Sequence, residues 1–422
     1  MTLEATKKKL SLPAKIMIGM VLGMIVGYLV GPRIEVIGFV GTIFMRLLRM
    51  CIYPLVLISI IAGVSNVADM RRLRKVGVGF LLYTAITSTI AAILAVIVME
   101  ILRPGQGVVL GDAGATSVGQ LASVSDSFIN WIPDNPFSAM STGNLIQIIV
   151  FSLLFGVMLA SIRETETGKA VFRLVEGLNE IVTKMVGWVI GLAPYGVFAL
   201  MAVMVGTTGF EVMGGLAKLL IAYYVGIITF TVVVLPLILK FVGRVSPLRH
   251  FRNIYPVMVM AFTTCSSVGT LPVTMKSAKE RCGVPGDIVG LLSAPAATMN
   301  MNGAAIEYPC FVLFASFIYN VHFSLPELAF MIILCVIMSC GAAGVPGGGI
   351  MMCAICLNVM GLPETIVPLI AGVYTLFDLG STLLNVTGDT VGMVTISSRL
   401  KELDEDVFYG RKTLPDVSGR FS

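Results

Sequence analysis

Between residues 16 and 242, apolar residues gather into long runs that polar residues seldom interrupt. The runs are Ile16–Val30, Ile34–Val64, Val76–Met99, Leu145–Ile162, Ile181–Val205 and Leu216–Val242. An α-helix of about 20 apolar residues crosses the ~30 Å hydrocarbon core of a bilayer, whereas the strands of a membrane barrel alternate apolar and polar residues. The pattern predicts six ordinary membrane-spanning helices, of which the first is short.

The pattern changes after residue 250, where glycine, proline, serine and threonine interrupt the apolar runs. Residues 263–274 read TTCSSVGTLPVT and residues 339–349 read SCGAAGVPGGG. The apolar stretches on either side of each segment are too short to cross a bilayer. Irregular backbone is tolerated at membrane depth only when protein buries it or when it lines a wet cavity. We therefore expect two re-entrant helical hairpins whose tips meet inside the membrane.

A longer apolar segment with a polar interruption follows each hairpin. The first interruption is NMNG at Asn300–Gly303 and the second is NVTGD at Asn385–Asp389. Interrupted segments in corresponding positions of two repeats mark the binding site of many transporters. An odd number of crossings separates the two copies, so they should be inverted relative to each other. The predicted fold is an all-α membrane protein with eight transmembrane helices, two of them broken, and two re-entrant hairpins.

Composition and charge support a membrane protein and exclude several functions. Hydrophobic residues make up 56% of the 422 residues and charged residues only 13%, about half the share of charged residues in a soluble domain. Basic clusters near residues 7–9, 71–75 and 244–252 all fall on the side of the N-terminus, which makes that side cytoplasmic. These loops account for the net charge of +5 without a nucleic-acid partner. Two distant histidines and cysteines scattered through apolar runs argue against catalysis, so we expect no enzyme.

The last apolar segment carries a stripe of polar side chains. Asp378, Thr382, Asn385 and Asp389 recur at helical spacing and would share one face of a helix. Ionisable residues inside a membrane span are costly and are functional hypotheses by default. Carboxylate, hydroxyl and amide oxygens suit a hard cation or an ammonium group. A structural alternative is that the aspartates pair with arginines of the second run.

Glu307 is a third carboxyl inside an apolar segment, on the predicted face of Asn300 and Ala304. It is a candidate proton carrier, or a neutral acid hydrogen-bonded in the core.

The glycines of the two hairpin tips would let backbone groups face a ligand directly. Half-helix N-termini stabilise a carboxylate and C-terminal carbonyls coordinate a cation. A ligand with both a carboxylate and an ammonium group fits this set, with Asp378 holding the amine. The stripe contains no basic residue, so a second carboxylate on the substrate would lack a partner there.

Several motifs together resemble the glutamate-transporter family of sodium-coupled dicarboxylate and amino-acid symporters. They are CSSVGTLPVTM at 265–275, ATMNMNGAAI at 297–306, GAAGVPGGG at 341–349, DLGSTLLNVTGD at 378–389, RLLRMCIYPL at 46–55 and APYGVFAL at 193–200. The resemblance implies a homotrimer in the plasma (inner) membrane of a prokaryote, with both termini cytoplasmic. It also implies an elevator mechanism, in which a transport domain slides against a scaffold with the second hairpin as gate.

The resemblance further implies a division of the chain. The scaffold would comprise residues 13–66 and 120–206, and the transport domain residues 76–103, 214–243 and 251–402, followed by a cytoplasmic tail at 403–422.

Carried over from the family, the substrate and ion sites fall on named positions of this chain. The substrate-binding residues would be Ser267, Val345, Gly349, Asp378, Ser381, Thr382 and Asn385. One sodium site would use Asp389 with carbonyls near Ala296, Asn300 and Asn385. A second would use carbonyls at Thr298, Ser339, Cys340 and Ala342. A third would draw on Thr87, Ser88, Asn300 and Asn302.

Departures from the family pattern narrow the expected cargo. Asn302 stands where the family signature has an aspartate that helps hold the third sodium, so we expect two coupled sodium ions rather than three. Members that carry acidic substrates have an arginine at the position of Ser381 or of Cys265, and its loss removes bidentate recognition of a side-chain carboxylate. Another departure is Tyr374, where many relatives have an aspartate.

The sequence therefore predicts a symporter for a small neutral L-amino acid such as alanine, serine or threonine, driven by sodium, with Glu307 as candidate proton carrier. One alternative is an acidic amino acid or dicarboxylate, bound through an arginine from elsewhere such as Arg46 or Arg49. An alternative of another class is a gated ion-conducting pore, because a polar stripe with carboxylates also suits a cation path.

Overall fold

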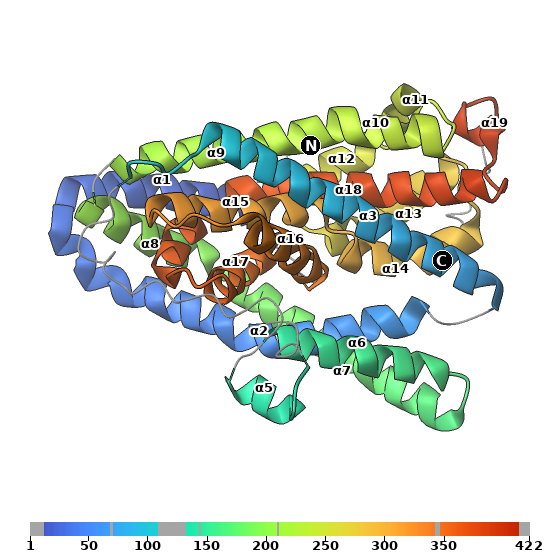
Figure 1. The fold of residues 1–422 in the computed structure, drawn as a ribbon, viewed down its shortest axis with the longest axis horizontal. Coiled ribbons are helices and arrows are strands. Elements are labelled where there is room, and N and C mark those ends of the chain that lie inside the picture. The colour runs from blue at the N-terminus through green and yellow to red at the C-terminus, as the bar shows by residue number, and fades with distance from the viewer. Residues whose placement is uncertain are drawn as a thin grey trace, which may run out of the picture.

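The computed structural model describes residues 12–67, 71–108, 132–142, 145–208, 211–341 and 347–412, and no β-strand occurs among them. Figure 1 shows an elongated bundle with α18 running along its middle. Its first helices are α1 (Leu12–Val30), α2 (Gly38–Val67), α3 (Arg71–Leu102), α5 (Pro136–Thr142), α6 (Leu145–Ser161), α7 (Glu166–Gly191), α8 (Ala193–Thr208) and α9 (Glu211–Thr229). Then follow α10 (Leu235–Leu237), α11 (Pro247–Asn253), α12 (Tyr255–Thr264), α13 (Ser267–Glu280), α14 (Gly286–Met299), α15 (Asn302–Ile318), α16 (Leu325–Cys340), α17 (Gly348–Val359), α18 (Val367–Arg399) and α19 (Glu405–Phe408).

One group of helices consists of α1, α2, α6, α7 and α8, which pack mainly on one another. Glycines explain the tightest of these contacts. Gly19, Gly23 and Gly27 recur every four residues on α1, and a Cβ atom on any of them would collide with the backbone of α8. Small residues at such spacing let membrane helices approach closely.

A second group consists of α3, α9 and α12 to α18, with α15 and α18 at its centre. The α15 and α18 backbones touch where Gly303 meets Ser381, because a Cβ on that glycine would overlap the Ser381 backbone. The two groups meet where α18 contacts α8 and α14 contacts α2. The predicted roles of scaffold and transport domain, and their boundaries, stay predictions.

The predicted hairpin at residues 263–274 is a helix–turn–helix. α12 ends at Thr264, and Cys265 after it is left-handed, with a φ of 51° and a ψ of 34°. Ser266 caps α13 by accepting a 2.9 Å hydrogen bond from the Gly269 N–H. The second predicted hairpin is flanked by α16 and α17, which pack against each other. Its tip at 342–346, with the predicted Ala342 and Val345 positions, lies outside the described residues.

The first predicted helix break is present and the second is not. Asn300 and Met301 are non-helical, with ψ angles of 79° and 60°, and they separate α14 from α15. The predicted break at Asn385–Asp389 is wrong, because α18 is one continuous helix from Val367 to Arg399. Gly388 serves close packing there, since a Cβ on it would lie 2.5 Å from Asn302 Nδ2.

The run Ile181–Val205, predicted as one ordinary helix, is bent in the structure. α7 starts earlier, at Glu166, and α8 follows it at an angle of 48°. Pro194 stands in the first turn of α8, where its missing N–H and fixed φ favour a helix start over a helix interior. The run Leu216–Val242 stays one long helix, with π-helical stretches at Phe230–Val234 and Ile238–Val242 around α10.

Several helical stretches are long and apolar enough to cross a membrane. Among the described residues they are Ala14–Leu47, Val76–Leu102, Met213–Val242, Gly286–Ile318 and Glu364–Arg399, with the bent pair α7–α8 as a sixth when counted as one span. The predicted total of eight stays a prediction, because α6 is shorter than such a span and α2 does not count as a separate one. Leu82, Ile86, Ile90, Ile93 and Ile97 leave an exposed apolar stripe along α3, as expected for a helix against lipid.

Part of the predicted tail at 403–422 packs onto the bundle. The Phe408 carbonyl accepts hydrogen bonds from Arg249 Nε at 3.0 Å and from Asn253 Nδ2 at 2.9 Å. The Asp404 N–H donates to the Gly283 carbonyl at 2.9 Å. Residues 404–412 are thereby joined to α11 and to the turn between α13 and α14.

Candidate functional site

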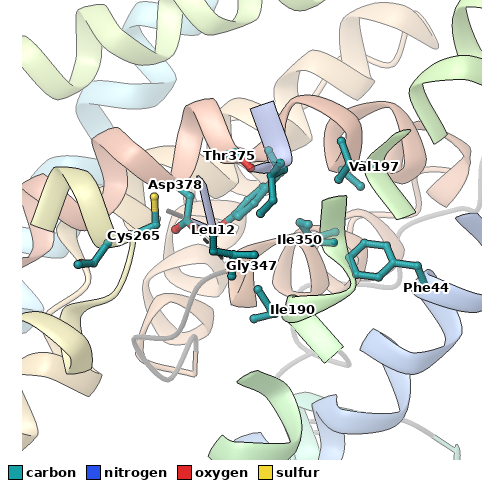
Figure 2. Close-up of a pocket in the computed structure, with 14 residues that line it drawn as sticks. Leu12, Phe44, Ile190, Val197, Cys265, Gly347, Ile350, Thr375 and Asp378 are labelled. Atoms are coloured by element: carbon teal, nitrogen blue, oxygen red, sulfur yellow. Dashed lines mark hydrogen bonds between the residues drawn. The ribbon is translucent and has the colours of Figure 1, made fainter. Parts of the chain in front are cut away.

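A small cavity with a volume of about 40 Å³ lies between the two helix groups. Its apolar wall comes from α1, α2, α7 and α8, and its polar end comes from the first hairpin, the start of α17 and α18. The lining residues are Leu12, Ile16, Phe44, Ile190, Ala193, Val197, Thr264, Cys265, Gly347, Ile350, Ala371, Tyr374, Thr375 and Asp378. In Figure 2, Cys265 and Asp378 stand together at one end and Phe44 at the other.

Asp378 is the carboxylate of this cavity and is nearly completely buried. Its Oδ2 atom accepts a 3.1 Å hydrogen bond from the Gly347 N–H at the end of the second hairpin, and the Thr382 side chain lies beside it. No basic side chain lines the cavity among the residues that the structure describes. The arrangement offers a negative charge, one backbone donor and a hydroxyl, which suits an ammonium group.

The other predicted substrate residues fall at different distances from this cavity. The first hairpin contributes Thr264 and Cys265 to the lining, whereas Ser267 is buried at the start of α13 and does not line it. Gly349 lies behind the cavity, where a Cβ atom would collide with the Tyr374 hydroxyl and approach a carboxyl oxygen of Glu307. Their contact with substrate stays a prediction.

The predicted first sodium site centres on Asp389 and Asn300, both buried. Asn300 Nδ2 donates to Asp389 Oδ1 at 2.8 Å, and the Asn300 N–H donates to the Ala296 carbonyl at 3.1 Å. The Asn300 Oδ1 atom is buried without a hydrogen-bond partner among the described residues. An unsatisfied oxygen beside a carboxylate at a helix break fits a cation of oxygen-preferring type.

Asn385 joins α18 to the break that precedes α15. Its Oδ1 atom accepts from the Gly303 N–H at 2.7 Å, and its Nδ2 atom faces the Met301 sulfur at 3.1 Å. This amide is therefore engaged with the helix break, and its predicted roles toward substrate and sodium stay predictions.

The predicted second sodium site lies where the end of α16 approaches the end of α14. The Cys340 thiol faces the Met299 carbonyl at 3.5 Å, and the Thr298 hydroxyl donates to the Pro295 carbonyl at 3.3 Å. The Ser339 hydroxyl bonds within its own helix. The structure thus brings Thr298, Ser339 and Cys340 into one region, while Ala342 lies outside the described residues.

The predicted third site pairs α3 with α15. The Ser88 hydroxyl donates to Asn302 Oδ1 at 3.2 Å, and Asn302 Nδ2 is buried without a partner among the described residues. The Thr87 hydroxyl donates to the Tyr83 carbonyl of its own helix at 2.9 Å. An amide therefore occupies the centre of this group, and a carboxyl would be needed for a strong cation ligand.

Comparison with known proteins identifies the family of this chain. The sequence profile of the sodium:dicarboxylate symporter family matches residues 12–399. The chain belongs to that family. It is 29% identical over 411 residues to a proton/sodium-glutamate symport protein of Bacillus caldotenax, covering 94% of this chain and 97% of the relative. It is 30% identical to a C4-dicarboxylate transport protein of Anaeromyxobacter sp. (strain K), covering 86% and 84%, and 28% identical to a proton/glutamate-aspartate symporter of Escherichia coli (strain K12), covering 85% and 84%. The predicted resemblance is confirmed.

In this symporter, the described contacts of the two stripe aspartates do not involve Arg46. Asp378 bonds to Gly347 and Asp389 to Asn300, whereas the Arg46 side chain is exposed on α2. The side chain of Arg49 lies outside what the structure describes.

Glu307 of this symporter is completely buried on α15. Its carboxyl group faces Tyr374 and Ser381 on α18, and Asp378 is close enough to act on it electrostatically. Asn300 does not share its face as predicted, because Asn300 precedes the start of α15 and points to Asp389 instead.

Sequence reasoning missed the cavity positions Thr375, Ile350 and Gly347. Gly347 carried a signal, because it stands in the glycine-rich segment at the tip of the second hairpin, and its φ of 76° requires such a residue.

Proposed function

We propose that this chain is a sodium-coupled symporter that takes up a small neutral L-amino acid such as alanine, serine or threonine. The observation that carries this proposal is the polar end of the cavity, where Asp378 is accompanied by Cys265 and, among the described lining residues, by no basic side chain. An α-ammonium group would pair with Asp378, and a second carboxylate on the substrate would meet no cation. Ser381, one turn further along α18, offers a hydroxyl where a guanidinium would be needed.

The second candidate is an acidic amino acid or a C4-dicarboxylate. The names of the relatives favour it, since they are described as glutamate, glutamate–aspartate or C4-dicarboxylate carriers. Such a substrate would need a positive charge brought to the cavity from outside its described lining. Membership of a symporter family argues against the ion-conducting pore considered from the sequence.

Sodium would enter with the substrate as co-transported cargo. The pair Asp389 and Asn300 supports one ion site, because the Asn300 oxygen has no hydrogen-bond partner within the described part of the chain. Carbonyls near Thr298, Ser339 and Cys340 would form another. Asn302 lacks the charge that a third site needs, so we infer two sodium ions per cycle, with Glu307 as candidate proton carrier.

The transport step would be a movement of the second helix group against the first. The cavity lies on the surface shared by the two groups, so a sliding movement would carry a bound substrate with Asp378. The Gly347 N–H bonded to Asp378 would have to be displaced before an ammonium group binds, which makes the second hairpin a gate. The family resemblance supports a homotrimer in the inner membrane of a prokaryote, with cytoplasmic termini.

Thermal stabilisation of the purified protein by a panel of amino acids tests this proposal. A ligand that binds only the folded state raises the apparent stability by mass action. Alanine, serine or threonine should shift the unfolding temperature in sodium and not in choline. A shift by aspartate or succinate alone would establish the second candidate, and shifts independent of sodium would refute the coupling.

A further inference from the structure

Glu307 is a buried carboxyl whose two oxygens have no well-aligned hydrogen-bond donor in the described part of the protein. Its side chain is 0% exposed, and neither carboxyl oxygen has a hydrogen bond of good geometry among the described residues, although the Tyr374 and Ser381 side chains lie close to it. Buried polar groups are almost always satisfied, so an exception calls for a partner that is absent from the free protein or for a function. No basic side chain of the described residues compensates this carboxyl.

The carboxyl lies behind the Tyr374 side chain, which lines the cavity proposed for the substrate. It faces Tyr374, which lines that cavity, and Ser381, which lies three residues after Asp378 on α18. Residues three apart on a helix are neighbours on its surface, with Cβ atoms about 5–6 Å apart. A substrate whose ammonium group is on Asp378 can therefore direct its side chain toward Ser381 and the carboxyl of Glu307.

The start of α17, in the second hairpin, packs over the same carboxyl. A Cβ atom on Gly349, in the first turn of α17, would lie 2.7 Å from Glu307 Oε1 and would collide with the Tyr374 hydroxyl. The absence of a side chain at this position lets the start of α17 pack directly against Glu307 and Tyr374. The Glu307 carboxyl is therefore enclosed between α18 and the start of α17, and the displacement of the second hairpin proposed above would uncover it.

The chemistry of this carboxyl selects the substrate side chain. A carboxylate repels another carboxylate, and either form of the carboxyl retains an oxygen that accepts a hydrogen bond. A methyl group placed there would offer these buried acceptors no donor, whereas a hydroxyl, amide or amino group would add a hydrogen bond to one of them. Sites built to hydrogen-bond a substrate group reject analogues that lack it.

We propose that Glu307 is a specificity-determining residue that accepts a hydrogen bond from a donor on the substrate side chain. The cargo is then an amino acid with a side-chain hydroxyl, amide or amino group, and serine or threonine is preferred over alanine. This inference rests on the proposed function, because it assumes that the α-ammonium group is on Asp378. It assigns Glu307 a contact with substrate in addition to any proton that it carries.

Matched pairs of amino acids that differ by one donor test the inference. Serine is compared with alanine, and threonine with 2-aminobutyrate, by thermal stabilisation of the purified full-length protein in sodium. The donor-bearing member of each pair should bind about tenfold more tightly. The preference should vanish in Glu307→Met and persist in part in Glu307→Gln, whose amide oxygen still accepts. Tyr308→Phe, next to Glu307 and equally buried, is the control and should keep the wild-type ratio.

The outcomes separate this inference from the proposed function. Equal affinity for serine and alanine in the wild type overturns the inference and leaves the neutral symporter intact. An unchanged preference in Glu307→Met also overturns it. Binding of aspartate with no binding of any neutral amino acid overturns the proposed function itself. Should Glu307→Met fail to fold, the wild-type ratio and a reduced ratio in Glu307→Gln decide the question.

Discussion

The Gly347 N–H donates a 3.1 Å hydrogen bond to Asp378 Oδ2, which joins the end of the second hairpin to the carboxylate of the cavity. The same oxygen is the group that we expect to hold the substrate ammonium. Substrate and gate would therefore compete for one acceptor, so that binding of one releases the other.

Replacing Asp378 by asparagine should strongly weaken substrate binding. Asparagine keeps an oxygen for the Gly347 N–H but removes the charge that a charge-assisted bond to an ammonium group needs. Such a bond contributes about 1.5–3 kcal/mol, so affinity should fall roughly 10- to 100-fold. The thermal stabilisation that substrate gives in sodium measures this loss of affinity. Asp287→Asn, on the exposed first turn of α14, is the control. Equal substrate affinity in the two variants would show that Asp378 does not bind the substrate.

Replacing Asn302 by aspartate should increase the number of sodium ions coupled to substrate binding. The new carboxylate would stand beside the Ser88 hydroxyl, now 3.2 Å from Asn302 Oδ1, and would supply the charge that this group lacks. The dependence of substrate affinity on sodium concentration should become steeper by about one ion. Asn320→Asp, in the exposed turn after α15, should leave the slope unchanged. A slope near three ions in the wild type would show that Asn302 does not limit the stoichiometry.

Replacing Gly388 by alanine should destabilise the protein and weaken sodium binding together. The added Cβ would lie 2.5 Å from Asn302 Nδ2 and 3.0 Å from Asn300 Nδ2, so both amides would have to move. Overpacking of this kind costs about 1–3 kcal/mol. Gly177→Ala is the matched control, because nothing lies within 4 Å of its added Cβ. Thermal unfolding with and without sodium compares the two variants. Normal stabilisation of Gly388→Ala by sodium would contradict the predicted link between packing at Gly388 and sodium binding.

The stability of the protein should fall in acid because of His250. Burial lowers the pKa of His250 in α11 from 6.5 to about 3, so the folded protein holds this ring neutral. The unfolded chain binds a proton there as the pH falls below about 6.5, and stability is lost from that pH down to about 3. At pH 5 the loss should be about 2 kcal/mol.

His250→Gln removes this proton uptake and provides the comparison. Glutamine can still face the Thr390 hydroxyl, which lies 3.2 Å from His250 Nε2. The unfolding temperature of the variant should decrease less between pH 7.5 and pH 5 than that of the wild type. Parallel curves for the two proteins would show that His250 is protonated in the folded state.

An arginine at position 381 should not by itself create an aspartate carrier. In Ser381→Arg, the guanidinium would meet the Glu307 carboxyl that Ser381 now faces, and an ion pair would leave no free positive charge. The double variant Ser381→Arg with Glu307→Gln removes this competitor. Aspartate should stabilise the double variant in sodium and should not stabilise the single variant. Equal responses of the two would show that Glu307 does not reach this position.

Much of the architecture follows from local sequence patterns. The first hairpin and the break at Asn300 were both predictable, because polar and glycine-rich stretches inside short apolar segments leave few alternatives in a membrane. The false break in α18 shows the limit of that rule. A Gly-Asp pair in an apolar run indicates either a bend or a close contact, and Gly388 makes the contact with Asn302 on another helix.

The parts of the site that depend on helix register were not predictable from spacing. Glu307 and Ser381 are brought together by the contact of Gly303 with the Ser381 backbone, four residues before Glu307 on α15. The prediction that Asn300 and Glu307 share one helix face was wrong, because Asn300 is not helical. The bend before Pro194 was similarly missed, since an apolar run through a proline can continue or turn and packing decides which.

Uptake into proteoliposomes tests the central claim most directly. The purified protein is reconstituted, an inward sodium gradient is imposed, and accumulation of labelled serine is measured with and without excess unlabelled aspartate. The account predicts serine accumulation that needs the sodium gradient and that excess aspartate leaves unchanged. Accumulation of aspartate with no uptake of serine would contradict it.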